Sequence, residues 1–160
     1  PPPALVTRLA KTFRETDGDL AAVTRVLVTS DEAWSLPLTK MRSPQEFLFA
    51  SWRLFGRVPE EAQRGLGQLN QLGEPLWSPA GPNGFPDQSA AWSQPEQIKL
   101  RLDIAAPMPR QLREPTNPSD LLDEMLGPAA SQETRDTVRR AETKQQGLAL
   151  LLMSPEMQRR

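Results

Sequence analysis

The sequence predicts an all-α fold: a compact bundle of about seven to nine helices at mixed crossing angles, with one long ordered loop. Apolar residues recur along most of the chain with the three- and four-residue spacing of a helical face. The 17 prolines fall between these apolar blocks, and inside them they would break a helix. Because no stretch shows the alternation of a strand bounded by hairpin turns, we expect no sheet.

Two helices are expected on either side of Gly18, which ends the first, while Asp19 suits the N-cap of the second. Ser30 is expected to cap a further short turn. The first helix carries an apolar strip on one face, and we expect the strip of the second to face inward. The strips are Leu5, Val6, Leu9, Ala10 and Phe13, followed by Leu20, Val23, Val26 and Leu27.

The most apolar helix is expected to begin at Pro44, which occupies a first helical position. Apolar side chains between Phe47 and Phe55 cover much of its circumference, so we expect it to lie centrally. The next helix starts near Pro59, where two glutamates suit the positive end of a helix dipole, and it ends at Gly73. Later helices are expected to begin at side-chain caps. These N-caps are Ser93, Asn117, Ser131, Thr143 and Ser154, with Glu96 and Gln146 completing capping boxes at the first and fourth.

Composition excludes several classes of function. The formal net charge of −1 removes the usual electrostatic basis for binding nucleic acid. The absence of cysteine and histidine excludes thiol chemistry, Ser-His-Asp triads and histidine-based metal sites within this chain, so we expect no cofactor and no metal. The longest apolar run, Leu148 to Met153, is far shorter than the roughly 20 residues of a membrane span.

We expect a single helical domain over residues 1–160. The chain opens on Pro1-Pro2-Pro3 directly before a helical pattern, with neither an initiating Met nor a signal peptide. That opening is typical of a segment cut from a longer protein.

Residues 74–94 form the segment that we single out for function. They are rich in Pro, Gly, Asn and Trp and have no periodicity of helix or strand. Ordered loops of this length are uncommon inside compact domains and tend to be functional or tightly packed on themselves. The candidate ligand-binding residues are Trp77, Asn83, Phe85, Asp87 and Trp92, together with Arg101 on the following helix.

Two interpretations of these residues stay open. The aromatic rings, with nearby amide and carboxylate groups, suit stacking on a sugar or a Pro-rich peptide. The more common alternative is that the rings pin the loop to the helices. Arg101 is expected to reach loop carbonyls or Asp87 in a structural role.

Other charged groups favour structural roles. Glu15, Asp17 and Asp19 resemble part of a calcium loop but lack its further ligands, so a helix cap explains them better. Asp87, Glu96 and Asp103 are candidates for a glycosidase carboxylate pair, but Glu96 is assigned to a cap and Asp103 to an ion pair with Lys99. The pairs Arg139-Arg140 and Arg159-Arg160 are expected on solvated helix faces.

Four segments together resemble a bacterial family catalogued as domain of unknown function 1800, specifically its C-terminal third. They are PPPALVTRLAKTFRETDGDL, VLVTSDEAW followed by Lys40 and SPQEFLFASWRLFG, LGEPLWSPAGPNGFPD ahead of Trp92, and LALLLMSPEMQ. The chain departs from the family at Glu74, Trp77 and Phe85, where the family more often has Gln, Phe and Trp. The resemblance implies a longer parent protein, frequently exported to the periplasm or beyond, and it implies no established activity and no catalytic residues.

These observations favour a non-catalytic structural and interaction domain of a larger exported protein. Its expected partners are the rest of the parent chain or another protein. One alternative is a carbohydrate- or cell-envelope-binding module that uses the loop 74–94. Another is a part of an enzyme whose catalytic residues lie upstream of Pro1.

Overall fold

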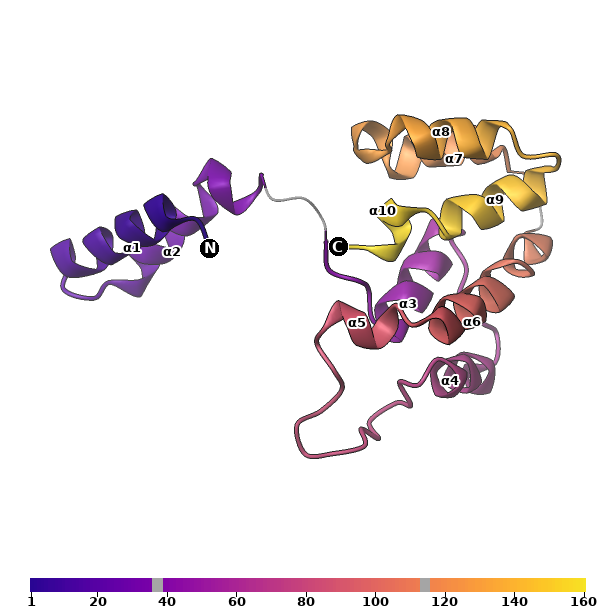
Figure 1. The fold of residues 1–160 in the computed structure, drawn as a ribbon, viewed down its shortest axis with the longest axis horizontal. Helices are drawn as coiled ribbons and strands as arrows, with labels where there is room; N and C mark the ends of the chain where they lie inside the picture. The colour runs from indigo at the N-terminus through magenta and orange to yellow at the C-terminus, as the bar shows by residue number, and fades with distance from the viewer. Residues whose placement is uncertain (36–38, 113–115) are drawn as a thin grey trace. The chain divides into compact units, whose positions relative to one another are not determined.

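The computed structural model describes residues 1–35, 39–112 and 116–160 (Figure 1). These residues form ten α-helices, eight of them at least eight residues long, and three short 3₁₀ helices. Within the described ranges the only strand-like pairing is one antiparallel bridge between Met41 and Arg159. The predicted all-α fold is confirmed. The chain divides into two compact units, Pro1–Leu38 and Thr39–Arg160, and the expectation of a single domain stays a prediction.

The N-terminal unit is a hairpin of α1 (Pro3–Glu15) and α2 (Leu20–Val28), followed by the 3₁₀ helix η1 (Asp31–Ala33). Asp19 caps α2 as predicted, because its carboxylate accepts hydrogen bonds from the N–H groups of Ala21 and Ala22. Arg8 of α1 donates two hydrogen bonds of 2.8 Å to the carboxylate of Glu32. This bidentate pair fixes η1 against α1.

The expectation that the apolar strip of α2 faces inward is wrong for part of the strip. Leu20 is 69% exposed, Leu27 is also exposed, and α2 contains no buried residue. In α1 only Leu5 is buried, while Phe13 remains half exposed. Two helices packed side by side cover only the narrow seam between them, so a wider apolar strip remains in contact with solvent.

The C-terminal unit is built around α3 (Pro44–Leu54) and α9 (Lys144–Leu152). Helix α9 contacts α6 (Pro95–Ala105), α7 (Pro118–Met125), α8 (Gln132–Arg139) and α10 (Pro155–Gln158), whereas α3 contacts α4 (Ala62–Gln71) and α10. Two 3₁₀ helices complete the unit, η2 (Met108–Gln111) and η3 (Gly127–Ala129). The central position predicted for α3 agrees with Phe47 and Leu48, whose side chains have no exposed surface.

The core between these helices is almost entirely aliphatic. Burying such side chains supplies the dominant stabilisation of a domain of this size. It consists of Phe47, Leu48, Leu54, Leu69, Leu72, Ile104, Ala105, Met108, Leu121, Leu122, Ala130, Val138, Leu148, Leu151, Leu152 and Met157.

The predicted capping box of Ser93 and Glu96 is wrong. A four-residue helix, α5 (Ser89–Trp92), precedes this point, and Ser93 is its C-cap with φ −111° and ψ 13°. A residue in that conformation cannot also take the extended conformation of an N-cap. Helix α6 therefore begins after Gln94, without a side-chain cap, and the described caps include a full capping box at Ser43 and Glu46 instead.

The remaining predicted N-caps agree with the structure in part. Asn117, Ser131, Thr143 and Ser154 each accept a hydrogen bond from a backbone N–H in the first turn of the following helix. Ser30 precedes η1 without forming such a bond. Among the described residues, no helix has the length and apolar character needed to cross a membrane.

Glu156 of α10 joins the last helix to the start of α8. One carboxylate oxygen accepts a 2.8 Å hydrogen bond from the backbone N–H of Ser131, and the other accepts one of 2.8 Å from the hydroxyl of Thr134. Burial opposes ionisation of this carboxyl group, but the hydrogen bonds outweigh burial and lower its pKa from 4.5 to about 2.

We predict that Glu156→Gln lowers the stability of the C-terminal unit by about 1–2 kcal/mol at pH 7. The pKa of Glu156 is lower in the folded state, so its contribution is complete above about pH 4.5 and disappears as the pH falls toward 2. Urea unfolding at pH 7 and pH 3 checks this, because the variant should differ from the wild type less at pH 3. The exposed Glu142, replaced by Gln, is the control, and an equal difference at both pH values would contradict the assignment.

Candidate functional site

The loop singled out from the sequence leaves α4 at Gly73 and reaches α5 at Ser89. Gly73 adopts a φ of +81°, which a residue with a side chain rarely adopts, and this conformation ends α4. Two turns follow, in which Ser78 N–H donates to the carbonyl of Pro75 and Gly84 N–H to that of Gly81. The expectation of no regular structure over residues 74–94 is wrong for its end, which forms α5.

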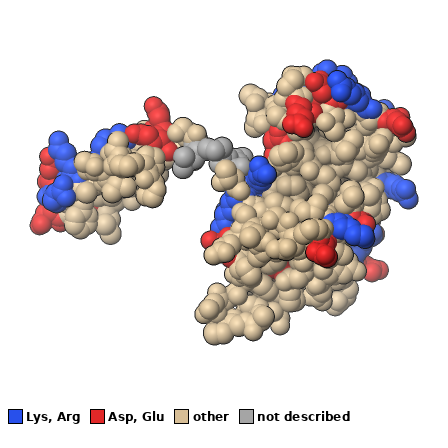
Figure 2. All heavy atoms as spheres, in the orientation of Figure 1, with Lys and Arg blue, Asp and Glu red and all other residues tan. Residues whose placement is uncertain are grey.

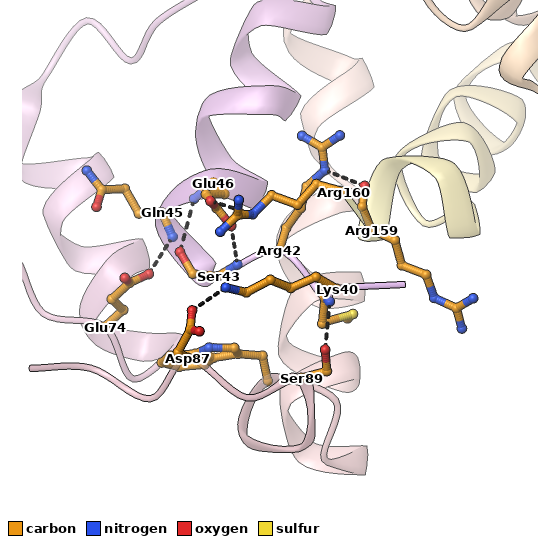
Figure 3. Close-up of polar contacts among 12 residues, drawn as sticks. Lys40, Arg42, Ser43, Gln45, Glu46, Glu74, Asp87, Ser89, Arg159 and Arg160 are labelled. Carbon is orange, nitrogen blue, oxygen red and sulfur yellow. Dashed lines mark hydrogen bonds and ion pairs between the residues drawn. The ribbon is translucent and has the colours of Figure 1, made fainter. Parts of the chain in front are cut away.

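Both ends of the loop are fixed to the start of α3 and to the segment ahead of it (Figure 3). At the start, the carboxylate of Glu74 accepts a 2.7 Å hydrogen bond from the backbone N–H of Gln45. At the far end, Lys40 forms an ion pair with Asp87, and the N–H of Met41 donates to the hydroxyl of Ser89 over 2.9 Å. The loop is therefore held to the C-terminal unit at both of its ends, and it is not a free linker.

The three candidate aromatic residues do not form one platform. Trp92 is only 5% exposed, and its indole N–H donates to the carbonyl of Pro86 over 2.9 Å. Phe85 is half-buried, whereas Trp77 is 90% exposed. Trp92 thus fastens the loop, as the structural interpretation expects, and Trp77 offers its ring to solvent.

The two polar candidates of the loop differ in their environment. Asn83 is exposed, and its side chain forms no hydrogen bond within the part of the chain that the structure describes. Asp87 is bonded to Lys40, and the hydrogen bond and charge of that ammonium hold the pKa of Asp87 below its ordinary value. The carboxylate is therefore ionised and occupied by the ion pair.

Arg101 lies away from the partners expected for it. The side chain is fully buried and donates to Gln158 Oε1 over 3.0 Å and to the carbonyl of Arg42 over 2.6 Å. Its guanidinium carbon lies 5.1 Å from the centre of the Phe47 ring. Burial lowers the pKa of Arg101 to about 10, although the carboxylates of Glu74 and Glu46 oppose this shift. The expected contacts with loop carbonyls or Asp87 are wrong, because the guanidinium points toward the C-terminus of the chain instead.

The C-terminal residues complete this cluster, which the sequence did not reveal. Lys40 and Arg160 exchange two backbone hydrogen bonds, and Arg160 Nε lies 2.8 Å from Glu46 Oε1 (Figure 3). The expectation that Arg159-Arg160 lies on a helix face is wrong, since α10 ends at Gln158 and the chain then becomes extended. Partners about 115 positions apart leave no local signal in a sequence.

The carboxylates near the loop are engaged in structural contacts. Glu46 accepts from the N–H of Ser43, and Asp103 pairs with Lys99 over 2.6 Å as predicted. Glu96, which was assigned to a cap, forms none. Within the described ranges no three acidic residues are grouped so that they could hold a metal ion. These contacts hold the loop in place and leave one face of it open to solvent.

That face carries no charge. Residues 75–86 include no acidic or basic side chain. Figure 2 shows charged side chains of both signs scattered over the larger unit, while the projecting loop at its lower left is free of either colour. A ligand of this face would be held by apolar contact and neutral hydrogen bonds, and not by long-range attraction.

We predict that Arg101→Met destabilises the C-terminal unit by about 2–4 kcal/mol. The methionine side chain keeps most of the volume, but Gln158 Oε1 and the carbonyl of Arg42 each lose a buried donor. Urea unfolding followed by circular dichroism measures the loss. Arg53→Met, an exposed position on α3, should stay within about 0.5 kcal/mol of the wild type. If the two variants proved equally stable, the structural role of Arg101 would be refuted.

Comparison with known proteins identifies the family. A family model described as protein of unknown function (DUF1800) matches residues 1–159. No curated protein and no solved structure matches the chain. That the chain is the C-terminal third of a longer, exported parent stays a prediction. Since the match covers both units, the chain belongs to the DUF1800 family of proteins of unknown function.

Proposed function

We propose that the chain is a non-catalytic interaction domain that binds a protein partner through the loop residues 75–86, with Trp77 as the anchor. The observation that carries this proposal is the 90% exposure of Trp77 on a segment fixed at both ends. Burying an aromatic side chain away from water is favourable, and an indole exposed to water lacks this free energy. A partner that covers the ring would supply it.

The backbone at Trp77 supports the same proposal. Trp77 has a φ of 58°, a left-handed conformation that is costly for a residue with a bulky side chain. Such strain is about 1–3 kcal/mol and persists where the surroundings impose it, often at binding sites. Here the clamped ends of the loop impose it, and the result is an indole turned outward before any partner binds. A preformed loop loses little conformational entropy on binding.

The neighbour of Trp77 favours a protein as the ligand. Leu76 is 47% exposed, so an aliphatic and an aromatic side chain stand together on an uncharged surface. Tryptophan is enriched among the few residues that carry most of the binding energy at protein interfaces, typically in a pocket ringed by weaker contacts. We therefore expect the complex to depend little on salt concentration.

Binding of a neutral glycan is the second candidate. The exposed indole could stack on the C–H face of a pyranose, and the free amide of Asn83 could bond to a hydroxyl. With Trp92 buried and Asp87 paired to Lys40, residues 74–94 offer a sugar one highly exposed ring, that of Trp77. This single ring makes the protein partner the better-supported proposal.

Photo-crosslinking tests the proposal. We predict that p-benzoylphenylalanine placed at position 77, in cells that make the protein, yields a discrete crosslinked protein. The same group at position 34, a second exposed tryptophan, is the control. With the identified partner purified, Trp77→Ala should weaken binding at least tenfold, whereas Trp34→Ala should not.

Two results would count against the proposal. Equal crosslinking from positions 34 and 77, or unchanged affinity of Trp77→Ala, would remove the loop as the contact surface. A saturable change in tryptophan fluorescence with envelope glycans, lost in Trp77→Ala and without a protein crosslink, would establish the glycan candidate instead.

A further inference from the structure

A groove between α6 and α9 forms a second hollowed surface of the C-terminal unit, and it does not involve the loop. This α6–α9 groove has a volume of about 410 Å³, and residues of α6, η2 and α9 line it. The volume is within the range of small-ligand sites.

The floor of the α6–α9 groove is aliphatic. Leu102 and Ala106 come from the end of α6, and Ala149, Leu150 and Met153 come from the later turns of α9 and its C-cap. None of these side chains carries an N–H group, an O–H group or an oxygen atom. Leu102 remains 48% exposed. The floor therefore suits an apolar part of a ligand that needs no hydrogen bonds.

The polar residues of the groove gather at one of its ends. Thr143 is the N-cap of α9, and Gln145 and Gln146 lie in the first turn of this helix, ahead of its apolar positions. Helix α6 runs toward this end, where η2 follows it, contacts α9 and carries Arg110 (Figure 1). The groove is therefore amphipathic along its length.

The hydrogen bonds at the polar end leave donors available for a ligand. Thr143 Oγ1 accepts from the backbone N–H of Gln146 over 3.1 Å, and Gln146 Oε1 accepts from the backbone N–H of Glu142 over 2.8 Å. The second bond fixes the orientation of the amide, because only its oxygen can accept. The hydroxyl hydrogen of Thr143 and the Nε2 group of Gln146 thus remain as donors on exposed side chains that line the groove.

Arg110 supplies the charge of the groove. Its side chain is exposed and forms no ion pair within the described ranges. No acidic residue is among the described residues that line the groove. The two parallel N–H groups of a guanidinium match the two oxygens of a carboxylate. The polar end therefore complements an anion that only accepts hydrogen bonds.

We propose that the α6–α9 groove binds an aliphatic carboxylate, a fatty acid of medium chain length, with its head group at Arg110 and its chain on the apolar floor. An amine would meet a guanidinium and further donors, and a hydrocarbon would leave these donors without an acceptor. A peptide would place backbone N–H and C=O groups over a floor that offers them no partner. Thr143 and Met153 are separated by about 15 Å along α9, which limits the length of the chain.

An NMR titration of the ¹⁵N-labelled full chain with decanoate, at neutral pH and below the concentration at which micelles form, tests the proposal. We expect saturable shifts at backbone amides of α9 and η2. Decanol has the same chain without the charge, and butyrate has the same head group on a short chain, so each should bind at least about tenfold more weakly. An absence of saturable shifts, or equal binding of decanol, would overturn the proposal. Shifts confined to residues 75–86 would overturn it and leave the loop proposal standing.

Two further probes distinguish other sources of an anion. Decyl phosphate presents the same chain with a different head group, and N-acetyl-L-leucine represents the carboxyl end of a peptide. We expect decanoate to bind at least as tightly as decyl phosphate and more tightly than N-acetyl-L-leucine. Tighter binding of decyl phosphate would refute the carboxylate, and tighter binding of N-acetyl-L-leucine would refute the fatty acid and assign the groove to a peptide.

Two pairs of variants locate the contacts. Arg110→Gln removes the charge, so we expect at least about fivefold weaker binding of decanoate and unchanged binding of decanol, whereas Arg53→Gln, at an exposed position of α3, should change neither. Leu102→Ser should weaken the binding of both probes. Leu76→Ser, at a leucine of the loop with nearly the same exposure, should not. Equal effects of the two variants in either pair would contradict the placement of the ligand.

Discussion

The buried guanidinium of Arg101 is the interaction on which the candidate surface of the C-terminal unit depends. A charge removed from water requires acceptors inside the protein, and here they are Gln158 Oε1 and the carbonyl of Arg42. These contacts join α6, the segment ahead of α3, and α10. The same segment carries the Lys40 and Met41 anchors of the loop, and Gln45 in the first turn of α3 carries the third. One guanidinium nitrogen of Arg101 thus holds the same segment to which the loop is anchored, and another holds Gln158 of α10.

Helix α3 carries contacts of the loop near its start and one wall of an open groove near its end. Near its start, Gln45 and Glu46 bond to Glu74 and Arg160, which places the loop and the C-terminus at this end. Near its other end, Trp52 lines an open groove of about 450 Å³. Eleven residues of helix separate these ends by about 16 Å. Because the middle of α3 is buried in the core, both surfaces are carried by one rigid element.

Much of the secondary structure could be read from the sequence because its signals are local. Pro44 at a first helical position, and Asp19, Asn117 or Ser154 as an N-cap, act within one helical turn, and the structure agrees with each. The start predicted at Pro59 is displaced, because α4 begins at Ala62. The prediction of a capping box at Ser93 is wrong because the four-residue helix α5 is too short to show a periodicity in the sequence. The prediction that the apolar face of α2 is turned inward is wrong for a different reason. Periodicity shows that an apolar face exists, but it does not show what covers that face.

The sequence by itself determined the fold class, the absence of histidine and cysteine chemistry within these residues, and the suspicion that residues 74–94 matter. Only the tertiary structure decided which of the candidates face solvent. Trp77 and Trp92 are the same residue type in one loop, yet one is exposed and the other is buried and bonded to Pro86. Contacts between residues far apart in the chain, such as Lys40 with Asp87 and Arg101 with Gln158, make that choice. Such contacts form only when the helices pack, so no local pattern encodes them.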